Sequence, residues 1–187
     1  MLFKILPAFR QGTALPPLSV GMAAAKLGDR VLVMGCGDTR LIAAIGARTG
    51  LTGRTLAIDE SRDRCARADF VAQKEGTLIE TQTTPLTSVG VDAGSFDLVL
   101  VRDALREADV NRMAAALSEA HRVLRPGGRC LVIEGSPSRG LSALFGVGSK
   151  APAAEPITRA LGGVGFAGVR TLAERDGQLF VEAIKRA

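Results

Sequence analysis

Short runs of apolar, mostly β-branched residues alternate along the chain with segments whose apolar residues recur every three or four positions. The first pattern is typical of strands buried on both faces of a sheet, and the second is typical of amphipathic helices. Strands are predicted at residues 30–35, 55–59, 77–81, 96–101 and 129–134. Helices are predicted from the turn at 36–38 to Gly50, and over residues 61–74 and 109–124. Because strand and helix alternate at short spacing, we expect a parallel α/β sheet with right-handed crossovers.

The C-terminal part of the chain departs from this alternation. A helix is predicted at residues 156–161, followed by strands at 169–174 and 178–184. The Asp176-Gly177 pair between those strands is a strong signal for a two-residue hairpin turn. Residues 135–155 are rich in Gly, Ser, Ala and Pro, which predicts a mobile loop or lid. The expected architecture is therefore a parallel sheet closed by an antiparallel hairpin.

Length and charge favour one soluble domain. The chain has 187 residues and a net charge of +5, with 47% hydrophobic residues. We expect residues 1–187 to form a single domain in which residues 1–28 are an N-terminal arm or helix. That arm would cover the site or form a homodimer contact. Its apolar stretch is too short for a signal peptide or a membrane span, so a cytoplasmic protein that binds no membrane is expected.

The distribution of charge and aromatic residues argues against binding to nucleic acid. The sequence has no basic tract and only 4% aromatic residues for stacking on bases. Basic and acidic residues instead alternate, as in residues 59–64 (DESRDR), a pattern typical of a solvated helix start. We therefore expect a small-molecule partner.

Several catalytic side chains are missing. The chain has no Tyr, no Trp, one His and three Cys, so a Tyr general acid or base and any mechanism that needs two His are excluded. The cysteines, at positions 36, 65 and 130, form no Cys-x-x-Cys pair, which predicts buried or semi-buried free thiols in a reducing compartment and no metal site. Without Tyr, the Tyr-x-x-x-Lys dyad of a short-chain nicotinamide dehydrogenase cannot exist.

The turn after the first predicted strand and the end of the second one indicate a ligand site. In an open α/β sheet, ligands bind beyond the carboxyl ends of the strands, near the point where the strand order reverses. Gly35 and Gly37 permit close approach of the backbone to a ligand, and Asp59 ends the next strand. An acid at this distance from a Gly-x-Gly turn can accept hydrogen bonds from ribose hydroxyls. Together they indicate a cofactor that contains adenosine.

Four segments carry a more specific resemblance. They are VLVMGCGDTRL, LAIDES, GSFDLVLVRDAL and EAHRVLRPGGRCLVIE, and in order and spacing they resemble the class I S-adenosylmethionine-dependent methyltransferases. The resemblance covers residues 30–187 and includes the terminal hairpin. It implies one methyltransferase domain with a Rossmann-like doubly wound sheet of order 3-2-1-4-5-7-6, in which strand 7 is antiparallel. It also implies S-adenosylmethionine as the cofactor and methyl transfer to a small-molecule acceptor.

The resemblance assigns roles to particular residues. The segment of Met34, Gly35, Cys36 and Gly37 matches the glycine loop along the methionine part of the cofactor, and Asp59 matches the acid that holds the ribose hydroxyls. Glu60 would lie next to the adenine, and Thr84 or Pro85 falls where the family commonly has an acid facing the adenine amino group. Arg102 and Asp103 match the segment beside the methionine moiety and the acceptor, which makes Asp103 the candidate catalytic residue.

The sequence also departs from the family pattern. Val33 stands where the family usually has an acid, Thr39 replaces the third glycine, and no carboxylate lies between Glu80 and Asp92. Residues 105–107 replace a His-containing stretch that is frequent in small-molecule members. These departures motivate the alternative of a noncatalytic or degenerate S-adenosylmethionine-binding or regulatory protein on the same fold.

Overall fold

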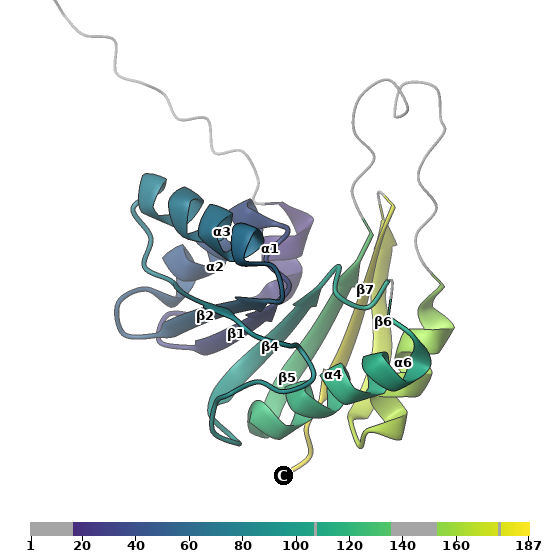
Figure 1. The fold of residues 1–187 in the computed structure, drawn as a ribbon. Coiled ribbons are helices and arrows are strands. Elements are labelled where there is room, and N and C mark those ends of the chain that lie inside the picture. The colour runs from purple at the N-terminus through teal and green to yellow at the C-terminus, as the bar shows by residue number, and fades with distance from the viewer. Residues whose placement is uncertain (1–16, 107, 136–152, 176) are drawn as a thin grey trace, which may run out of the picture.

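The computed structural model describes residues 17–106, 108–135, 153–175 and 177–187, which form one seven-stranded sheet flanked by helices (Figure 1). The elements in chain order are α1 (Leu18–Ala23), β1 (Arg30–Met34), α2 (Thr39–Thr49), β2 (Arg54–Asp59), α3 (Arg62–Lys74), β3 (Glu80–Thr83), β4 (Phe96–Arg102), α4 (Val110–Val123), β5 (Leu124–Glu134), α6 (Ala154–Gly163), β6 (Ala167–Arg175) and β7 (Gln178–Ile184).

The strand order confirms the expected fold class. It is β3-β2-β1-β4-β5-β7-β6, and β7 is antiparallel to both of its neighbours while the other pairs are parallel. The chain order reverses between β1 and β4, so the carboxyl ends of β1, β2 and β4 lie together at one edge. That edge is where an open α/β sheet places its ligand.

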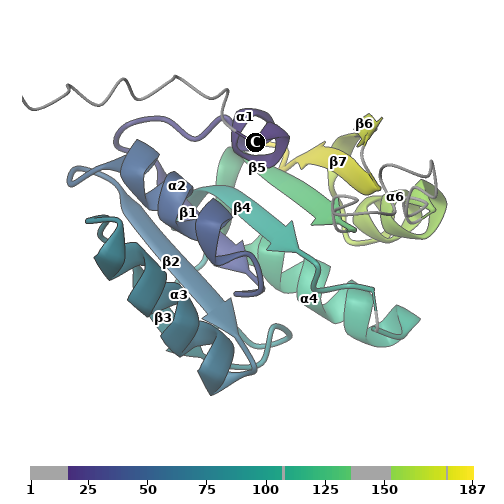
Figure 2. The same cartoon turned by 90° about the horizontal axis from the view of Figure 1, so that it is seen from above.

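Helices cover both faces of the sheet, with α1, α2 and α3 on one side and α4 and α6 on the other (Figures 1 and 2). The alternation of β1 shows why this strand is apolar from Val31 to Met34. Val31 and Val33 belong to the cluster packed with α1, α2 and α3, whereas Leu32 and Met34 belong to the cluster packed with α4 and α6. Successive side chains of a strand point to opposite faces, so a strand between two helical layers needs an apolar residue at every position.

The predicted helices begin and end close to the expected residues. Asp38 Oδ1 accepts a hydrogen bond from the N–H of Leu41 at 3.1 Å and caps α2, which ends at Gly50. Ser61 caps α3 in the same way, and Asp109 caps α4. Each cap satisfies an N–H group that has no partner within its helix, which stabilises the helix start.

The prediction for the third strand was wrong in position. Residues 77–81 were expected, but β3 comprises Glu80–Thr83, and the neighbouring apolar residue Ile79 packs against the cluster under α2 instead. The strand lies at the sheet edge with a mostly exposed ETQT sequence. Its position is fixed by backbone pairing to β2, in which Leu56 opposes Glu80, and hydrophobicity carries no signal for such an edge strand.

The fifth strand begins earlier than predicted. Instead of starting at Arg129, β5 starts at Leu124, which pairs with Phe96, directly after the last residue of α4. The N–H of Gly127 donates to the carbonyl of Lys185 at 2.9 Å, and the N–H of Lys185 donates to the carbonyl of Gly128 at 2.9 Å. The Pro-Gly-Gly segment therefore lies within β5 and pairs with the chain just beyond β7, whereas α4 ends before it, at Val123.

The hairpin and the last helix agree with their predictions. Helix α6 includes the predicted residues 156–161, and β6 and β7 pair in antiparallel fashion up to Arg175 and Gln178. Asp176 of the predicted turn lies outside the described residues, as do residues 1–16 of the predicted arm and 136–152 of the predicted lid. In the described ranges, no helix is both long and apolar enough to span a membrane.

Glu182 of β7 ties the C-terminal hairpin to the sheet. Its buried carboxylate accepts hydrogen bonds from Arg129 Nη1 at 2.9 Å on β5 and from Arg170 Nη2 at 2.6 Å on β6. Burial by itself would raise the pKa of Glu182, but the two arginines outweigh it and lower that pKa. Arg129 also donates to the carbonyls of Met22 and Ala23 at the end of α1.

We therefore expect Glu182→Gln to lower the free energy of unfolding by about 2 kcal/mol, because a buried charge-assisted pair is broken while Arg129 stays partly buried. Urea unfolding measures the change. Glu155→Gln is the control, since the Glu155–Arg159 pair of α6 is exposed at 72% and 76%, and we expect it to change stability by less than about 0.5 kcal/mol. Equal effects of the two substitutions would contradict the assigned role of Glu182.

Candidate functional site

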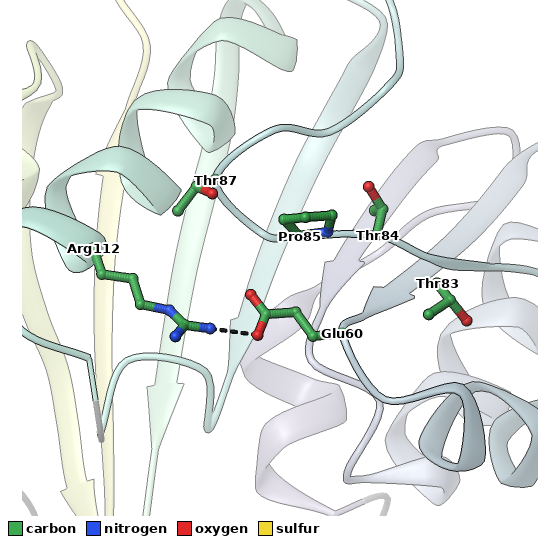
Figure 3. Close-up of a pocket in the computed structure, with 6 residues that line it drawn as sticks. All are labelled: Glu60, Thr83, Thr84, Pro85, Thr87 and Arg112. Atoms are coloured by element: carbon green, nitrogen blue, oxygen red, sulfur yellow. Dashed lines mark hydrogen bonds and ion pairs between the residues drawn. The ribbon is translucent and has the colours of Figure 1, made fainter.

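Two adjoining cavities open at the carboxyl ends of the central strands, and they share Glu60 and Arg112. The first cavity, of about 540 Å³, is lined by Glu60, Thr83, Thr84, Pro85, Thr87 and Arg112 (Figure 3). The second cavity, of about 550 Å³, is lined by Gly35, Gly37, Asp59, Glu60, Arg64, Leu86, Arg102, Asp103, Ala104, Arg106, Ala108 and Arg112. Each cavity has the size of a small-molecule site.

The two glycines of the loop after β1 have different local surroundings. Gly35 has a φ of 103°, and a Cβ added there would collide with the carbonyl oxygen of Arg102 at the end of β4. Gly37 lines the second cavity, and a Cβ added there would meet no atom within 4 Å. Glycine at position 35 is therefore required by the packing of β1 against β4, whereas glycine at position 37 leaves room on the cavity side.

Asp59, at the end of β2, accepts four hydrogen bonds. Its Oδ2 accepts from the N–H of Cys36 at 2.8 Å and from Arg64 Nε at 2.8 Å. Its Oδ1 accepts from the N–H of Ser61 at 2.8 Å and from Arg64 Nη2 at 2.6 Å. Burial by itself would raise the pKa of Asp59, but these donors outweigh it and hold the pKa below the usual value. Asp59 is therefore a carboxylate at neutral pH.

Glu60 extends from the end of β2 across the space between the cavities. It forms an ion pair with Arg112 of the first turn of α4, on the opposite wall, and Thr84 and Pro85 form another side of the first cavity (Figure 3). The pair joins residues that are 52 positions apart in the sequence. Its side chains are 38% and 53% exposed, so water and ions reach them and the pair contributes little to stability.

Arg102 and Asp103 join the ends of β4 and β5. Arg102 is buried, with Nη1 donating to the carbonyl of Gly135 at 2.8 Å and lying 2.7 Å from Asp103 Oδ2. Arg102 Nε lies 3.3 Å from Asp38 Oδ2 at the start of α2. Asp103 has a φ of 48°, and its Oδ1 accepts from the N–H of Gly135 at 2.8 Å. Both side chains line the second cavity and also hold its walls in place.

The structure brings together most of the residues predicted for the site. Gly35, Gly37, Asp59, Glu60, Arg102 and Asp103 line the second cavity, and Glu60 and Thr84 line the first one. Met34 and Cys36 line neither cavity. The Met34 side chain is buried in the cluster with α4, and Cys36 Sγ lies buried 4.0 Å from Cys65 Sγ. Of these two residues, Cys36 contributes its backbone N–H to Asp59.

Two arginines of the site, Arg64 and Arg112, were not predicted from the sequence. Residues 59–64 were interpreted as a solvated helix start, but Arg64 lines the second cavity and binds Asp59. Arg112 was not singled out either. Both arginines lie in the first turn of a helix that follows a strand of the parallel sheet. That position faces the carboxyl edge, and it is the signal that could have identified them.

Two observations limit the chemistry of the cavities. The single histidine, His121, packs edge-to-face on Phe166 with 4.9 Å between ring centroids and lines neither cavity. Val33, at the position of the family's usual acid, is fully buried between Ala57 and Leu100 of the neighbouring strands. The cavity walls therefore supply carboxylates, guanidinium groups and hydroxyls.

Comparisons with known proteins identify the family of the chain. A family model described as a methyltransferase domain matches residues 31–128. The chloroplastic 2-phytyl-1,4-beta-naphthoquinone methyltransferase of Arabidopsis thaliana is 30% identical over 121 residues, which cover 63% of this chain and 46% of that protein. The chain spans 31% to 51% of the length of the curated relatives that it matches.

Solved structures share the fold at low sequence identity. A SAM-dependent methyltransferase from Aquifex aeolicus has a TM-score of 0.68 at 19% identity, over 89% of this chain and 87% of that one. The cyclase SpnF has a TM-score of 0.70 at 17% identity, over 91% of this chain and 79% of that one. Because proteins named for different reactions share it, the fold by itself does not determine the chemistry.

The different surroundings of the two glycines predict different effects of substitution. We expect Gly35→Ala to lower the free energy of unfolding by at least about 2 kcal/mol, because it combines a strained φ with a backbone collision. We expect Gly37→Ala to change it by less than about 0.5 kcal/mol. Chemical denaturation measures both values. Similar destabilisation by the two variants would show that Gly37 is also constrained by packing.

The lowered pKa of Asp59 predicts a pH dependence of stability. A carboxyl group of this kind stabilises the fold above the pKa of the unfolded chain, about 3.9, and the stabilisation is lost as the pH falls through the folded-state pKa. We expect Asp59→Asn to destabilise the protein by about 2 kcal/mol at pH 7 and by progressively less below pH 4. Urea unfolding at several pH values measures this. Asp63→Asn, at an exposed position, is the control. A pH-independent effect of Asp59→Asn would contradict the assignment.

Proposed function

Because the chain belongs to the methyltransferase-domain family, we propose that it transfers the methyl group of S-adenosylmethionine, the cofactor of that family, to a small-molecule acceptor. The observation that carries this proposal is the position of Gly37 and Asp59 on one cavity wall. Gly37 leaves space for a ligand against the backbone, and Asp59 offers a carboxylate at the end of the next strand. A carboxylate accepts hydrogen bonds and donates none, which suits a ribose diol.

The residues around Asp59 fit the adenosine half of this cofactor. Asp59 would hold the ribose hydroxyls, and Glu60, Thr84 and Pro85 would flank the adenine in the first cavity. The two cavities share Glu60 and Arg112, and they have Thr84 in the lining of the first and Asp103 in that of the second. We therefore assign the first cavity to adenine and the second to the ribose, the methionine moiety and the acceptor.

The described residues favour catalysis by positioning. S-adenosylmethionine, when bound, would supply a methyl group on a sulfonium centre for in-line transfer to an acceptor atom, with S-adenosylhomocysteine as the leaving group. Arg102 and Asp103 hold the ends of β4 and β5 and shape the acceptor side of the second cavity. Alignment of two reactants can supply much of a rate acceleration, so this function is compatible with cavity walls that lack His and Tyr. Asp103, with its side chain 32% exposed, is the candidate for accepting a proton from the acceptor.

The nature of the acceptor is a separate part of the proposal. One relative is named a 2-phytyl-1,4-beta-naphthoquinone methyltransferase, but the mostly charged walls of the second cavity do not favour so apolar an acceptor. The described walls of the second cavity carry mostly charged and small residues, among them Arg106 and Ala108. A small polar acceptor therefore fits these walls best, and we propose an acceptor of that class.

Calorimetric titration with S-adenosylhomocysteine tests the cofactor assignment. We expect the wild-type protein to bind it and Gly37→Val to bind it at least about tenfold more weakly, because the added side chain fills the space beside the loop. Gly162→Ala in α6, also at an open position, is the control and should bind like the wild type. Absence of heat at millimolar ligand would refute the proposal. Binding without methyl transfer to any acceptor would favour the noncatalytic alternative.

A further inference from the structure

The carboxylate that the proposed function assigns to the ribose is already fully hydrogen-bonded. A carboxylate has two oxygens with about four acceptor positions. On Asp59 these positions are taken by the N–H groups of Cys36 and Ser61 and by two N–H groups of Arg64. A ribose diol needs two of the same positions. Binding of the cofactor to Asp59 therefore requires that two of the present donors leave.

The four donors differ in how easily they can leave. The N–H groups of Cys36 and Ser61 belong to the backbone of the glycine loop and of the turn before α3, and moving them would disrupt both segments. Arg64 reaches Asp59 through a long side chain that is 46% exposed. Its guanidinium can move into water while its helix stays in place, since α3 is anchored by buried Cys65 and Ala68. The donors that leave are those of Arg64.

The geometry of Arg64 matches that of the group it would be exchanged for. Its Nε and Nη2 lie 2.8 and 2.6 Å from the two oxygens of Asp59, so the guanidinium is a bidentate donor. The two adjacent hydroxyls of a ribose can also donate to both oxygens of one carboxylate. We infer that Arg64 is an internal competitor for the ribose site, which holds Asp59 in the free protein and is displaced when the cofactor binds. This inference rests on the proposed function.

Arg64 then determines how tightly the protein holds its cofactor. In the free protein it neutralises a buried carboxylate, so its removal should destabilise that state. In the bound protein the ribose hydroxyls donate to the same carboxylate, so removing the Arg64 side chain should destabilise the bound protein less than the free one. The difference between the two states appears as tighter binding. A purely structural role of Arg64 would lower stability without tightening binding.

The test is calorimetric titration of wild-type protein, Arg64→Met and Arg67→Met with S-adenosylhomocysteine. Met keeps an unbranched side chain and removes the donors, and Arg67 is an exposed residue of the same helix. We expect Arg64→Met to bind S-adenosylhomocysteine about three- to thirtyfold more tightly than the wild type. Without ligand it should melt at a lower temperature, and added ligand should raise its melting temperature more than that of the wild type. Arg67→Met should match the wild type in all three measurements.

Each other outcome has a definite meaning. Equal or weaker binding by Arg64→Met, with the wild type binding, would overturn the role of Arg64 and leave the proposed function intact. No binding by either protein would overturn the proposed function and this inference with it. If Arg64→Met does not fold, Arg64→Lys keeps the charge but offers a single ammonium group, and binding at least about twofold tighter is expected. Equal or weaker binding by a folded Arg64→Lys would then overturn the inference.

Discussion

The carboxylate of Asp59 connects the segments that form the site. Through it, the glycine loop after β1, the start of α3 and the side chain of Arg64 are held at the end of β2. The position of this carboxylate depends on the parallel pairing of β1 with β2, in which Met34 opposes Ile58, so that both strands end at the same edge. Replacing one of these segments would misplace the others, because all of them share the two oxygens of one buried side chain.

Three separate groups of ion pairs line the cavity walls. Asp59 binds Arg64, Glu60 binds Arg112, and Arg102 lies between Asp38 and Asp103. The buried Arg102 joins the ends of β4 and β5, whereas Arg64 and Arg112 are partly exposed at the cavity. A site of this kind is rigid where it must position groups and adaptable where a ligand enters. It therefore suits a protein whose cofactor carries the reactive group.

The sequence predicted the buried parts of the fold more accurately than the exposed ones. The strands β1 and β4 are apolar at nearly every position because both of their faces are covered, and this pattern is visible without a structure. The edge strand β3 has no such pattern, because its residues are largely exposed and backbone pairing determines its position. The early start of β5 depends on hydrogen bonds to Lys185, and contacts so distant in sequence leave no local signal. The order of the strands followed from the family resemblance.

The same distinction applies to the site. Gly35, Gly37 and Asp59 were identified because glycine permits close approach of a ligand to the backbone and a carboxylate at the end of a strand can accept hydrogen bonds from a ligand. Arg64 and Arg112 were missed because a charged residue in the first turn of a helix is usually solvated, and only the fold shows that each faces an acid in the cavity. Met34 and Cys36 were assigned to the loop from the motif, although the buried strand at residues 30–35 and the expected buried thiols already indicated side chains in the core.

A crystal structure of the protein with S-adenosylhomocysteine would show directly whether the ribose replaces Arg64 at Asp59. We expect ribose hydroxyls within hydrogen-bonding distance of both oxygens of Asp59, backbone of the glycine loop against the ligand at Gly37, and the guanidinium of Arg64 withdrawn from Asp59. Ligand bound away from this edge of the sheet, or ligand bound here while Arg64 still holds both oxygens of Asp59, would contradict this expectation.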